Sequence, residues 1–229
     1  MCGRYFSNSD KQKIAEWFQL RDVPDVALAP NYNVAPTTFE PVVRIGRDSA
    51  ERELELMRWG LVPHFAKSLA DFKGFSTINA RAETLATSSI WRVPFRKRRC
   101  LVPADGFYEW KALDDSKKPA KEPYAITLTN GEPMAFAGLW DAWKEPDGKW
   151  LQSFSIITTE ANEIMATIHT RMPVIVHQRD WVEWLDRDDS RPAPVHLLRQ
   201  YESDAMQLAR CNPLVGNVRN NGPEMLNSS

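Results

Sequence analysis

The chain has 229 residues, a formal net charge of -1 and 43% hydrophobic residues, which is typical of a globular protein and excludes fibrous and disordered classes. No run approaches the roughly 20 apolar residues of a membrane helix, and the start of the chain lacks the pattern of a signal peptide. The three cysteines include no CxxC pair, which argues against a disulfide framework and a structural zinc site. We therefore expect a cytoplasmic protein that is not secreted.

The first quarter of the chain is predicted to combine one helix with a β-hairpin. The helical spacing of apolar residues predicts an amphipathic helix over Ser9–Leu20, with Ser9 as its capping residue. Repeated prolines predict an irregular, extended connection over residues 23–38. The alternating pattern that follows predicts a hairpin of Pro41–Ile45 with Glu53–Trp59.

The remainder of the chain is predicted to be mainly β-structure with short helices. Apolar runs bounded by turn residues predict strands at Cys100–Lys111, Tyr124–Leu128, Met134–Leu139, Trp150–Thr158 and Pro173–Val176. Helical patterns cover Ala80–Thr87, Ala161–Thr167, Arg179–Leu185 and part of Val195–Ala209. Because no repeat or Gly/Ser linker divides the chain, the sequence predicts a single α+β domain over residues 1–229, built around antiparallel sheet.

A cluster of basic residues interrupts the otherwise balanced charge. Acidic residues concentrate in other parts of the chain, so the cluster indicates one basic face on a neutral body. A solvated surface run is the commoner explanation of such a pattern taken alone. The cluster spans eight residues and consists of Arg92, Arg96, Lys97, Arg98 and Arg99.

Cys2 becomes the first residue of the chain if Met1 is removed, as small second residues generally permit. A free amino-terminal cysteine carries an α-amine with a pKa of about 8 beside a thiol with a pKa of about 8.5. The amine converts an aldehyde to a Schiff base, and the thiol then closes a five-membered thiazolidine ring, which is far more stable. A cysteine in this position is also a common chance occurrence, so position alone leaves its role open.

Three further motifs carry groups suited to chemistry. In an extended segment, Asn79 and Arg81 project to the same side and pair an amide with a phosphate-binding guanidinium. Glu109 lies among aromatic residues that would desolvate it and raise its pKa, which suits a general acid or base. His169 and Arg171 place a titratable imidazole beside a fixed cation. Each motif also has a purely structural interpretation, such as an ion pair at the start of a helix or the end of a strand.

These motifs occur in the order expected of one family. Together they make the chain resemble the SRAP family, the SOS-response-associated peptidases now regarded as abasic-site processing proteins, most strongly over residues 2–220. The joint match is specific, although no single piece is. The motifs are Met1-Cys2-Gly3-Arg4-Tyr5, Tyr32-Asn33-Val34-Ala35-Pro36-Thr37, Trp59-Gly60-Leu61-Val62-Pro63, Asn79-Ala80-Arg81-Ala82-Glu83-Thr84, Arg99-Cys100-Leu101-Val102-Pro103-Ala104-Asp105-Gly106-Phe107-Tyr108-Glu109-Trp110 and His169-Thr170-Arg171-Met172-Pro173.

The resemblance implies a compact α+β fold with a mixed, largely antiparallel β core and peripheral helices. It also implies a covalent thiazolidine link between the protein and an abasic sugar in single-stranded DNA. Cys2 matches the family's nucleophile, Asn79 its positioning amide, Glu109 its acid/base carboxylate and His169 its active-site histidine.

The resemblance further implies a positively charged channel for DNA. Arg4, Arg81 and Arg171 match family positions near the DNA phosphates. The chain departs from the family at His64-Phe65, where some members carry an aromatic pair, so the resemblance does not extend to stacking on DNA bases at this position. We expect no cofactor and no metal, single-stranded DNA containing abasic sites as the partner, no membrane association, and a monomer.

Two alternative functions stay open. The first is a thiol autopeptidase in which Cys2, Glu109 and His169 remove Met1. The second is a non-catalytic module that binds single-stranded DNA through the basic cluster and aromatic residues. Within the main hypothesis a latent lyase activity is also expected, because a Schiff base that is not closed by the thiol invites β-elimination of the DNA strand.

Overall fold

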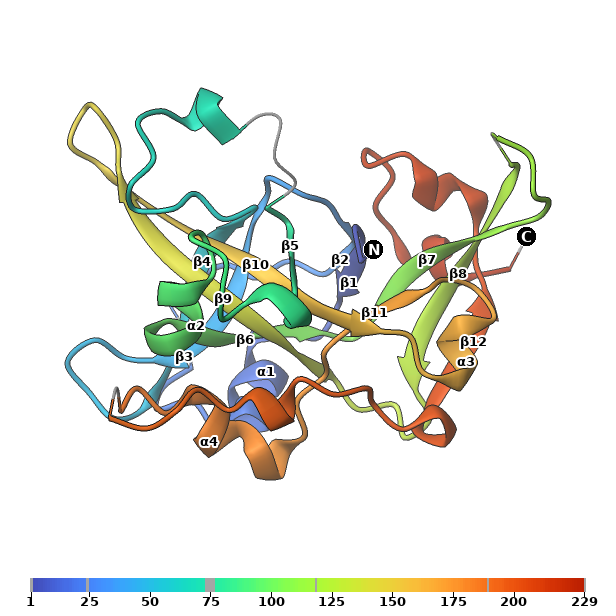
Figure 1. Ribbon diagram of the computed structural model, residues 1–229. Helices are drawn as coiled ribbons and strands as arrows, with labels where there is room; N and C mark the ends of the chain where they lie inside the picture. The colour runs from blue at the N-terminus through green and yellow to red at the C-terminus, as the bar shows by residue number, and fades with distance from the viewer. Residues whose placement is uncertain (1, 24, 73–76, 118, 189, 229) are drawn as a thin grey trace.

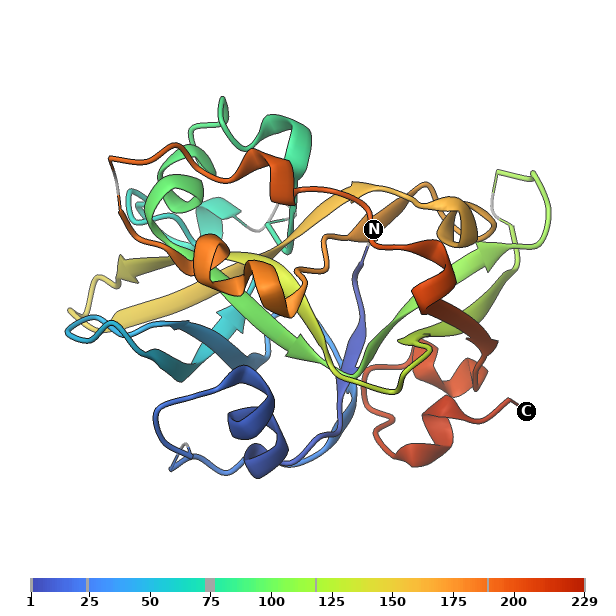
Figure 2. The ribbon, with the colours of Figure 1, turned by 90° about the horizontal axis from the view of Figure 1, so that it is seen from below.

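The computed structural model describes residues 2–23, 25–72, 77–117, 119–188 and 190–228, and shows two β-sheets with short helices around them (Figure 1). Seen from below, the long β9–β10 hairpin and the β7–β8 hairpin extend to opposite sides of the molecule (Figure 2). No helix in the described part of the chain has the length and apolar character required to cross a membrane.

The larger sheet has seven strands, and five of them close into a barrel. The strands of the barrel are β3 (Phe39–Ile45), β4 (Arg52–Trp59), β6 (Arg99–Ala104), β9 (Met134–Lys144) and β10 (Trp150–Glu160). They pair in the order β10-β4-β3-β6-β9, and β9 pairs again with β10. The β10–β4 pairing is parallel and the other pairings of the ring are antiparallel, so the core is mixed.

Strand β10 continues past the barrel and holds two short strands on its edges. β5 (Asn79–Arg81) runs parallel to it, with Asn79 beside Ile156. β11 (Arg171–Pro173) runs antiparallel, with Arg171 beside Glu160. β10 therefore brings two segments that are far apart in the sequence to neighbouring positions at one end of the barrel.

The smaller sheet has five antiparallel strands in the order β12-β8-β7-β1-β2. The amino terminus enters this sheet, and in Figure 1 the mark for the terminus lies between the labels of β5 and β7. The strands are β1 (Tyr5–Ser7), β2 (Asn31–Val34), β7 (Gly106–Ala112), β8 (Lys121–Leu128) and β12 (Met206–Arg210).

Short helices cover the outside of the sheets. α1 (Lys11–Phe18) begins where the Asp10 side chain accepts a hydrogen bond from the backbone of Lys13 at 2.9 Å. The other α-helices are α2 (Arg92–Lys97), α3 (Glu163–Ala166) and α4 (Trp181–Leu185). The 3-10 helices are η1 (Leu69–Phe72), η2 (Ala82–Thr84), η3 (Gln178–Asp180), η4 (Val195–Leu197), η5 (Ser203–Ala205), η6 (Pro213–Gly216) and η7 (Pro223–Leu226).

A large apolar cluster fills the barrel and its contact with the smaller sheet. Trp59, Phe136 and Phe154 come from the barrel, while Tyr5 and Phe107 come from the smaller sheet, and all are fully buried. The ring of Tyr5 lies edge-on to Trp59 with centroids 5.2 Å apart. Burying each such side chain contributes about 1.5–3 kcal/mol, so this cluster fixes the position of the smaller sheet against the barrel.

The predicted fold class is confirmed: the structure is α+β, with a mixed, largely antiparallel β core and peripheral helices. The single strand predicted over Cys100–Lys111 is wrong, because it is two strands, β6 and β7, in different sheets. The chain changes direction at Asp105, whose carboxylate accepts hydrogen bonds from the backbone of Asn8 at 2.7 Å and of Ser9 at 2.8 Å. Ser9 is held there, and Asp10 caps α1 in place of the predicted Ser9.

Three other local predictions are wrong because strand pairing overrides local propensity. The start of the predicted helix over Ala80–Thr87 is strand β5, followed by the short turn η2. The connection predicted over residues 23–38 contains β2, which pairs with β1. Part of Val195–Ala209 was predicted to be helical, and it contains only η4 and η5 before β12 pairs with β8.

Candidate active site around Cys2

Cys2 lies where the amino-terminal segment meets β7. The ladder between β1 and β7 begins at Tyr5, and one more backbone bond extends it, from the amide of Tyr108 to the carbonyl of Arg4 at 3.0 Å. Glu109 is the next residue of β7. Both candidate groups are buried: Cys2 is 0% exposed and Glu109 is 5% exposed.

Burial governs the chemistry of the Cys2 thiol. Desolvation raises the pKa of Cys2 far above its ordinary value, and the nearby negative charge of Glu109 raises it further. The thiol is therefore neutral at physiological pH. Because the thiolate is the reactive form in a direct nucleophilic attack, this environment makes Cys2 a poor first nucleophile.

Asn79 presents an open hydrogen-bond acceptor at the end of the barrel. The residue is 7% exposed, and its Nδ2 donates a long bond of 3.5 Å to the carbonyl of Ile156. Its Oδ1 is buried and has no hydrogen-bond partner among the residues that the structure describes. A buried polar atom left in this state costs roughly 1–3 kcal/mol, so a hydrogen bond donated to Oδ1 would stabilise this position.

His169 follows α3, which begins at the capping residue Asn162. The Nδ1 atom of His169 accepts a hydrogen bond from the backbone amide of Arg171 at 3.0 Å. Nδ1 also lies 3.3 Å from the carbonyl of Arg171, so this side of the ring faces the backbone of Arg171 in either tautomer.

Arg171 is held by an acidic side chain from a different part of the chain. Its guanidinium donates to both carboxylate oxygens of Glu83, at 2.6 and 3.1 Å, and to the carbonyl of Thr158 at 2.7 Å. This forked bond holds the pKa of Glu83 below its ordinary value. Glu83 therefore forms its ion pair with a residue far away in the sequence.

The four predicted catalytic residues lie around one apolar cluster. Cys2 belongs to it, together with Ile156 beside Asn79, Met165 in α3 just before His169, and Met172 after Arg171. Glu109 is close enough to the thiol to raise its pKa. The structure thus links Glu109 directly to Cys2, and it gives Asn79 and His169 neighbours in the same large apolar cluster. Their catalytic roles stay a prediction.

The three arginines predicted to contact DNA lie in different surroundings. Arg81 is exposed on β5. Arg171 is engaged with Glu83, as described above. Arg4 is partly buried: its Nη1 donates to Oδ1 of Asn33 at 2.6 Å and to the carbonyl of Val215 at 2.8 Å. The DNA contacts of all three residues stay predictions.

The basic cluster is only partly a surface feature. Arg92, Arg96 and Lys97 are exposed on α2. Arg99 is 8% exposed and donates to backbone carbonyls, among them those of Trp184 at 2.6 Å and Phe95 at 2.7 Å, so it joins α2 to α4 inside the protein. The predicted basic face is therefore smaller than the sequence run suggested.

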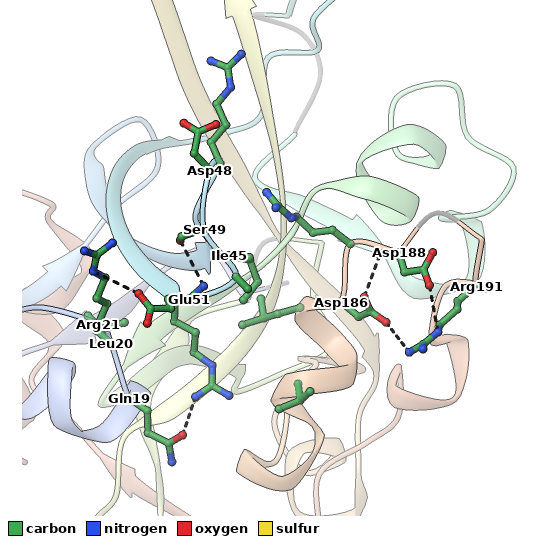
Figure 3. Close-up of a pocket in the computed structure, with 16 residues that line it drawn as sticks. Gln19, Leu20, Arg21, Ile45, Asp48, Ser49, Glu51, Asp186, Asp188 and Arg191 are labelled. Carbon is green, nitrogen blue, oxygen red and sulfur yellow. Dashed lines mark hydrogen bonds and ion pairs between the residues drawn. The ribbon is translucent and has the colours of Figure 1, made fainter.

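A wide cleft of about 1080 Å³ lies elsewhere, between the β3–β4 hairpin and the segment after α4 (Figure 3). None of the predicted site residues lines it. Many of its charges pair with each other: Arg21 contacts Glu51 at 3.3 Å, and Arg191 contacts Asp186 at 3.0 Å. Size alone therefore does not mark the site that carries the predicted chemistry.

Within the described ranges, no three His, Cys, Asp or Glu side chains are grouped so as to hold a metal ion. Cys2, Cys100 and Cys211 are all buried free thiols.

The fold and the site define a class of α+β proteins that bury a cysteine beside the amino terminus, next to a carboxylate. The sequence profile described as SOS response associated peptidase (SRAP) matches residues 1–218, and the chain belongs to this family. The abasic site processing protein YoqW of Bacillus subtilis (strain 168) is 40% identical over 230 residues, with 100% of both chains covered.

More distant proteins are also similar to this chain. The abasic site processing protein HMCES of Xenopus tropicalis is 32% identical over 240 residues, covering 95% of this chain and 71% of its own length. A solved structure of a protein from Bacteroides thetaiotaomicron superimposes with a TM-score of 0.85 at 26% identity, and 100% of both chains is covered. The fold is therefore that of the solved relatives.

Proposed function

We propose that the protein recognises abasic sites in single-stranded DNA and joins them to Cys2 as a covalent thiazolidine. The observation that carries the proposal is the burial of Cys2 against Glu109, in the cluster that Asn79 and His169 border. The names of the relatives, which are abasic site processing proteins, support the substrate. The reaction takes place once Met1 is removed, because the α-amine of Cys2 is otherwise part of a peptide bond.

The first step forms an imine. An abasic sugar is a cyclic hemiacetal with a small fraction of open aldehyde, so the ring must open first. In the proposed mechanism His169 assists proton movement at the ring oxygen. The amine nitrogen of Cys2 bonds to the aldehyde carbon, Glu109 moves protons at the amine and at the departing oxygen, and one water molecule leaves.

The second step closes the ring. The thiol sulfur of Cys2 adds to the imine carbon, the carbon–nitrogen double bond becomes single, and the thiol proton ends on the nitrogen. The open Oδ1 of Asn79 suits a hydrogen bond to the protonated imine, which would hold it for attack. In this order the amine reacts first, and the thiol is needed only after the imine has formed.

Ring closure protects the DNA strand. An imine acidifies the adjacent sugar carbon, and loss of that proton expels the 3′ phosphate, which is the lyase reaction. Rapid closure by a thiol attached to the same residue removes the imine before this happens. The protein therefore has a latent lyase activity that appears when closure is blocked.

The DNA backbone is proposed to pass over the exposed end of β5. Arg81 lies there, two residues after Asn79, and its exposed guanidinium suits a phosphate contact. Arg171 would contact DNA only by sharing or exchanging its bond to Glu83. We propose that the protein acts as a cytoplasmic monomer associated with DNA.

The autopeptidase alternative fits the family name. In it, the Cys2 thiol attacks the Met1 peptide bond while Glu109 or His169 takes the thiol proton. Intact mass of a Glu109→Ala variant tests this alternative: a retained Met1 would support it. A non-covalent DNA-binding module would leave no adduct on a denaturing gel.

The test of the proposed function uses Cys2→Ala, which preserves Met1 removal and the α-amine. Wild type incubated with an abasic oligonucleotide should give an adduct that survives heating without reduction. Cys2→Ala should give an adduct only after borohydride reduction, and should cleave more of the strand. The matched control is Cys211→Ala, another buried thiol, which lies in a different apolar cluster and should behave as wild type.

A heat-stable adduct from unreduced Cys2→Ala, in protein confirmed by mass to lack Met1, would contradict the thiazolidine and point to another nucleophile. An extension left in front of Cys2 supplies a second test. It blocks the amine, so it should abolish the adduct in otherwise unchanged protein.

A further inference from the structure

A nucleophile on the first residue of a chain has a positional problem, because it has a covalent neighbour on one side only. Chain ends are poorly ordered unless other contacts hold them. The pairing of β1 with β2 and β7 begins at Tyr5, so residues 2–4 lie beyond the regular ladder. The backbone bond from Tyr108 to Arg4 is the last ladder-like contact before Cys2.

The side chain of Arg4 supplies a second anchor at this point. Its Nη1 donates at 2.6 Å to Oδ1 of Asn33 and at 2.8 Å to the carbonyl of Val215, and its guanidinium lies 5.9 Å from the ring centre of Trp110. Burial lowers the pKa of Arg4, which agrees with a guanidinium engaged inside the protein.

Asn33 is the hub of this arrangement. It is 4% exposed and lies on β2, one residue before Val34, the pairing partner of Tyr5. Its Nδ2 donates to three carbonyls of the carboxyl-terminal segment: Val215 at 3.3 Å, Asn217 at 3.0 Å and Asn220 at 2.7 Å. One amide therefore connects the amino-terminal segment, β2 and residues 215–220.

We propose that Asn33 and residues 215–220 form a clamp on Arg4 that holds the amino-terminal segment, and with it Cys2, against Glu109. Asn33 is then a positioning residue for the crosslinking reaction, and this inference rests on the proposed function. Cys2 is two residues from Arg4, which is about 7 Å of extended chain, so a fixed Arg4 restricts where the amine and thiol can lie. A misplacement of about 1 Å at a reacting group can slow a reaction about 100-fold.

The clamp gives Arg4 a role different from a phosphate contact, and the two make opposite predictions. A phosphate contact contributes to affinity and to its salt dependence. A clamp contributes to the rate of reaction of bound DNA and leaves affinity unchanged. Asn33 separates the two roles cleanly, because it is uncharged and buried.

The experiment measures crosslinking of the full chain to an abasic oligonucleotide in single turnover, at increasing protein concentration. Asn33→Ala should lower the maximal rate roughly 10- to 100-fold. The concentration for half-maximal rate and the salt dependence should match wild type. Asn33→Asp keeps an acceptor for Arg4 but places a carboxylate oxygen beside the three carbonyls, where it cannot donate. Its maximal rate should therefore lie between those of wild type and Asn33→Ala.

Arg4→Lys keeps the positive charge but lacks the guanidinium that bonds to both Asn33 and the carbonyl of Val215. This variant tests the clamp if Asn33→Ala does not fold. Its maximal rate should fall while its salt dependence is retained. The control is Asn130→Ala, in the exposed turn after β8, whose side chain bonds only to neighbours in that turn. Mass spectra establish the loss of Met1 in every variant, and thermal unfolding establishes that each is folded.

The outcomes separate the clamp from the proposed function. If wild type forms no adduct, the proposed function fails. If wild type reacts and folded Asn33→Ala reacts as fast, the clamp is wrong. The clamp would also be wrong if Asn33→Ala kept the maximal rate of wild type but needed more protein for half-maximal rate and showed a flatter salt dependence. That result would make this region a DNA contact.

A reaction with formaldehyde, which needs neither DNA nor Glu109, tests the amine alone. Asn33→Ala should react with formaldehyde at least as fast as wild type. Loss of this reaction would place the defect in the amine and overturn the clamp.

Discussion

The surroundings of Cys2 and the wide cleft of Figure 3 use charged groups in opposite ways. In the cleft, acids and arginines are largely exposed and pair with each other, as Arg21 and Glu51 do at 57% and 58% exposure. Around Cys2, a carboxylate and a thiol are buried together, and the Oδ1 of Asn79 is buried without a partner among the described residues.

The cleft is the weaker candidate for chemistry despite its volume. Exposed ion pairs are screened by water and typically contribute about 0.2–1 kcal/mol, so they leave the reactivity of their members almost unchanged. Burial changes reactivity, as the raised pKa of the Cys2 thiol shows. A reactive site therefore needs removal of water from a few groups more than it needs space.

Among the substitutions that test this difference between the two regions, the largest effect on adduct formation is expected at Glu109. Glu109→Gln keeps the size and polarity of the side chain but removes proton transfer, so adduct formation should slow about 10²–10⁴-fold. DNA affinity should be retained. A timed denaturing gel measures the rate and a fluorescence titration measures the affinity.

The matched control is Glu51→Gln in the cleft, which should leave both quantities unchanged. An equal loss of rate and affinity in Glu109→Gln would assign Glu109 a structural role. A slow Glu51→Gln would show that the cleft takes part in the reaction.

A smaller effect is expected from single arginines. Arg81→Gln should weaken DNA binding and reduce the slope of log affinity against log salt by about 0.7, the value for one contact with a single-stranded phosphate. Arg191→Gln, a similarly exposed arginine of the cleft, should change neither. Fluorescence titrations at several salt concentrations measure both variants. If Arg191→Gln flattens the slope and Arg81→Gln does not, the DNA passes over the cleft and the proposed path along β5 is wrong.

The sequence proposes the members of the candidate site, but it does not indicate their partners. Cys2, Asn79, Glu109 and His169 stand in motifs that could be identified one at a time. The contacts that surround them join residues distant in the chain, such as Glu83 with Arg171 and Asn33 with residues 215–220, and no local pattern encodes them.

The elements of the fold also divide into those set by local sequence and those set by contacts with distant residues. The β3–β4 hairpin was predictable because its alternation is local, and the confirmed fold class rests on many such elements. The break at Asp105 was not predictable, because it depends on the amides of Asn8 and Ser9. β5 was predicted as the start of a helix, because its strand character comes from pairing with β10. Asn33 lay within a quoted motif, but its donors and acceptors are visible only in three dimensions.

The smallest expected effect concerns the ion pair of Arg171 with Glu83 and its dependence on pH. The pKa of Glu83 is lowered in the folded protein, mainly by the hydrogen bond from Arg171. A carboxylate of this kind stabilises the fold above its ordinary, unfolded pKa, and the contribution is lost as pH falls through the lower, folded pKa. Because Glu83 is 47% exposed, solvent screening limits the contribution to at most about 1 kcal/mol.

Glu83→Gln should therefore unfold slightly more easily than wild type at pH 7. The difference should decline as pH falls below the ordinary glutamate pKa of 4.5 and be lost below the lower pKa of the folded protein. Thermal unfolding over a pH series measures this, with Glu51→Gln as the control for an exposed ion pair of the cleft. The same substitution releases the guanidinium of Arg171, so DNA binding at low salt should strengthen if Arg171 contacts phosphate. Unchanged DNA binding, together with the expected loss of stability, would leave Arg171 as a support for β11 and His169, and would place the phosphate contacts on Arg81 and its exposed neighbours.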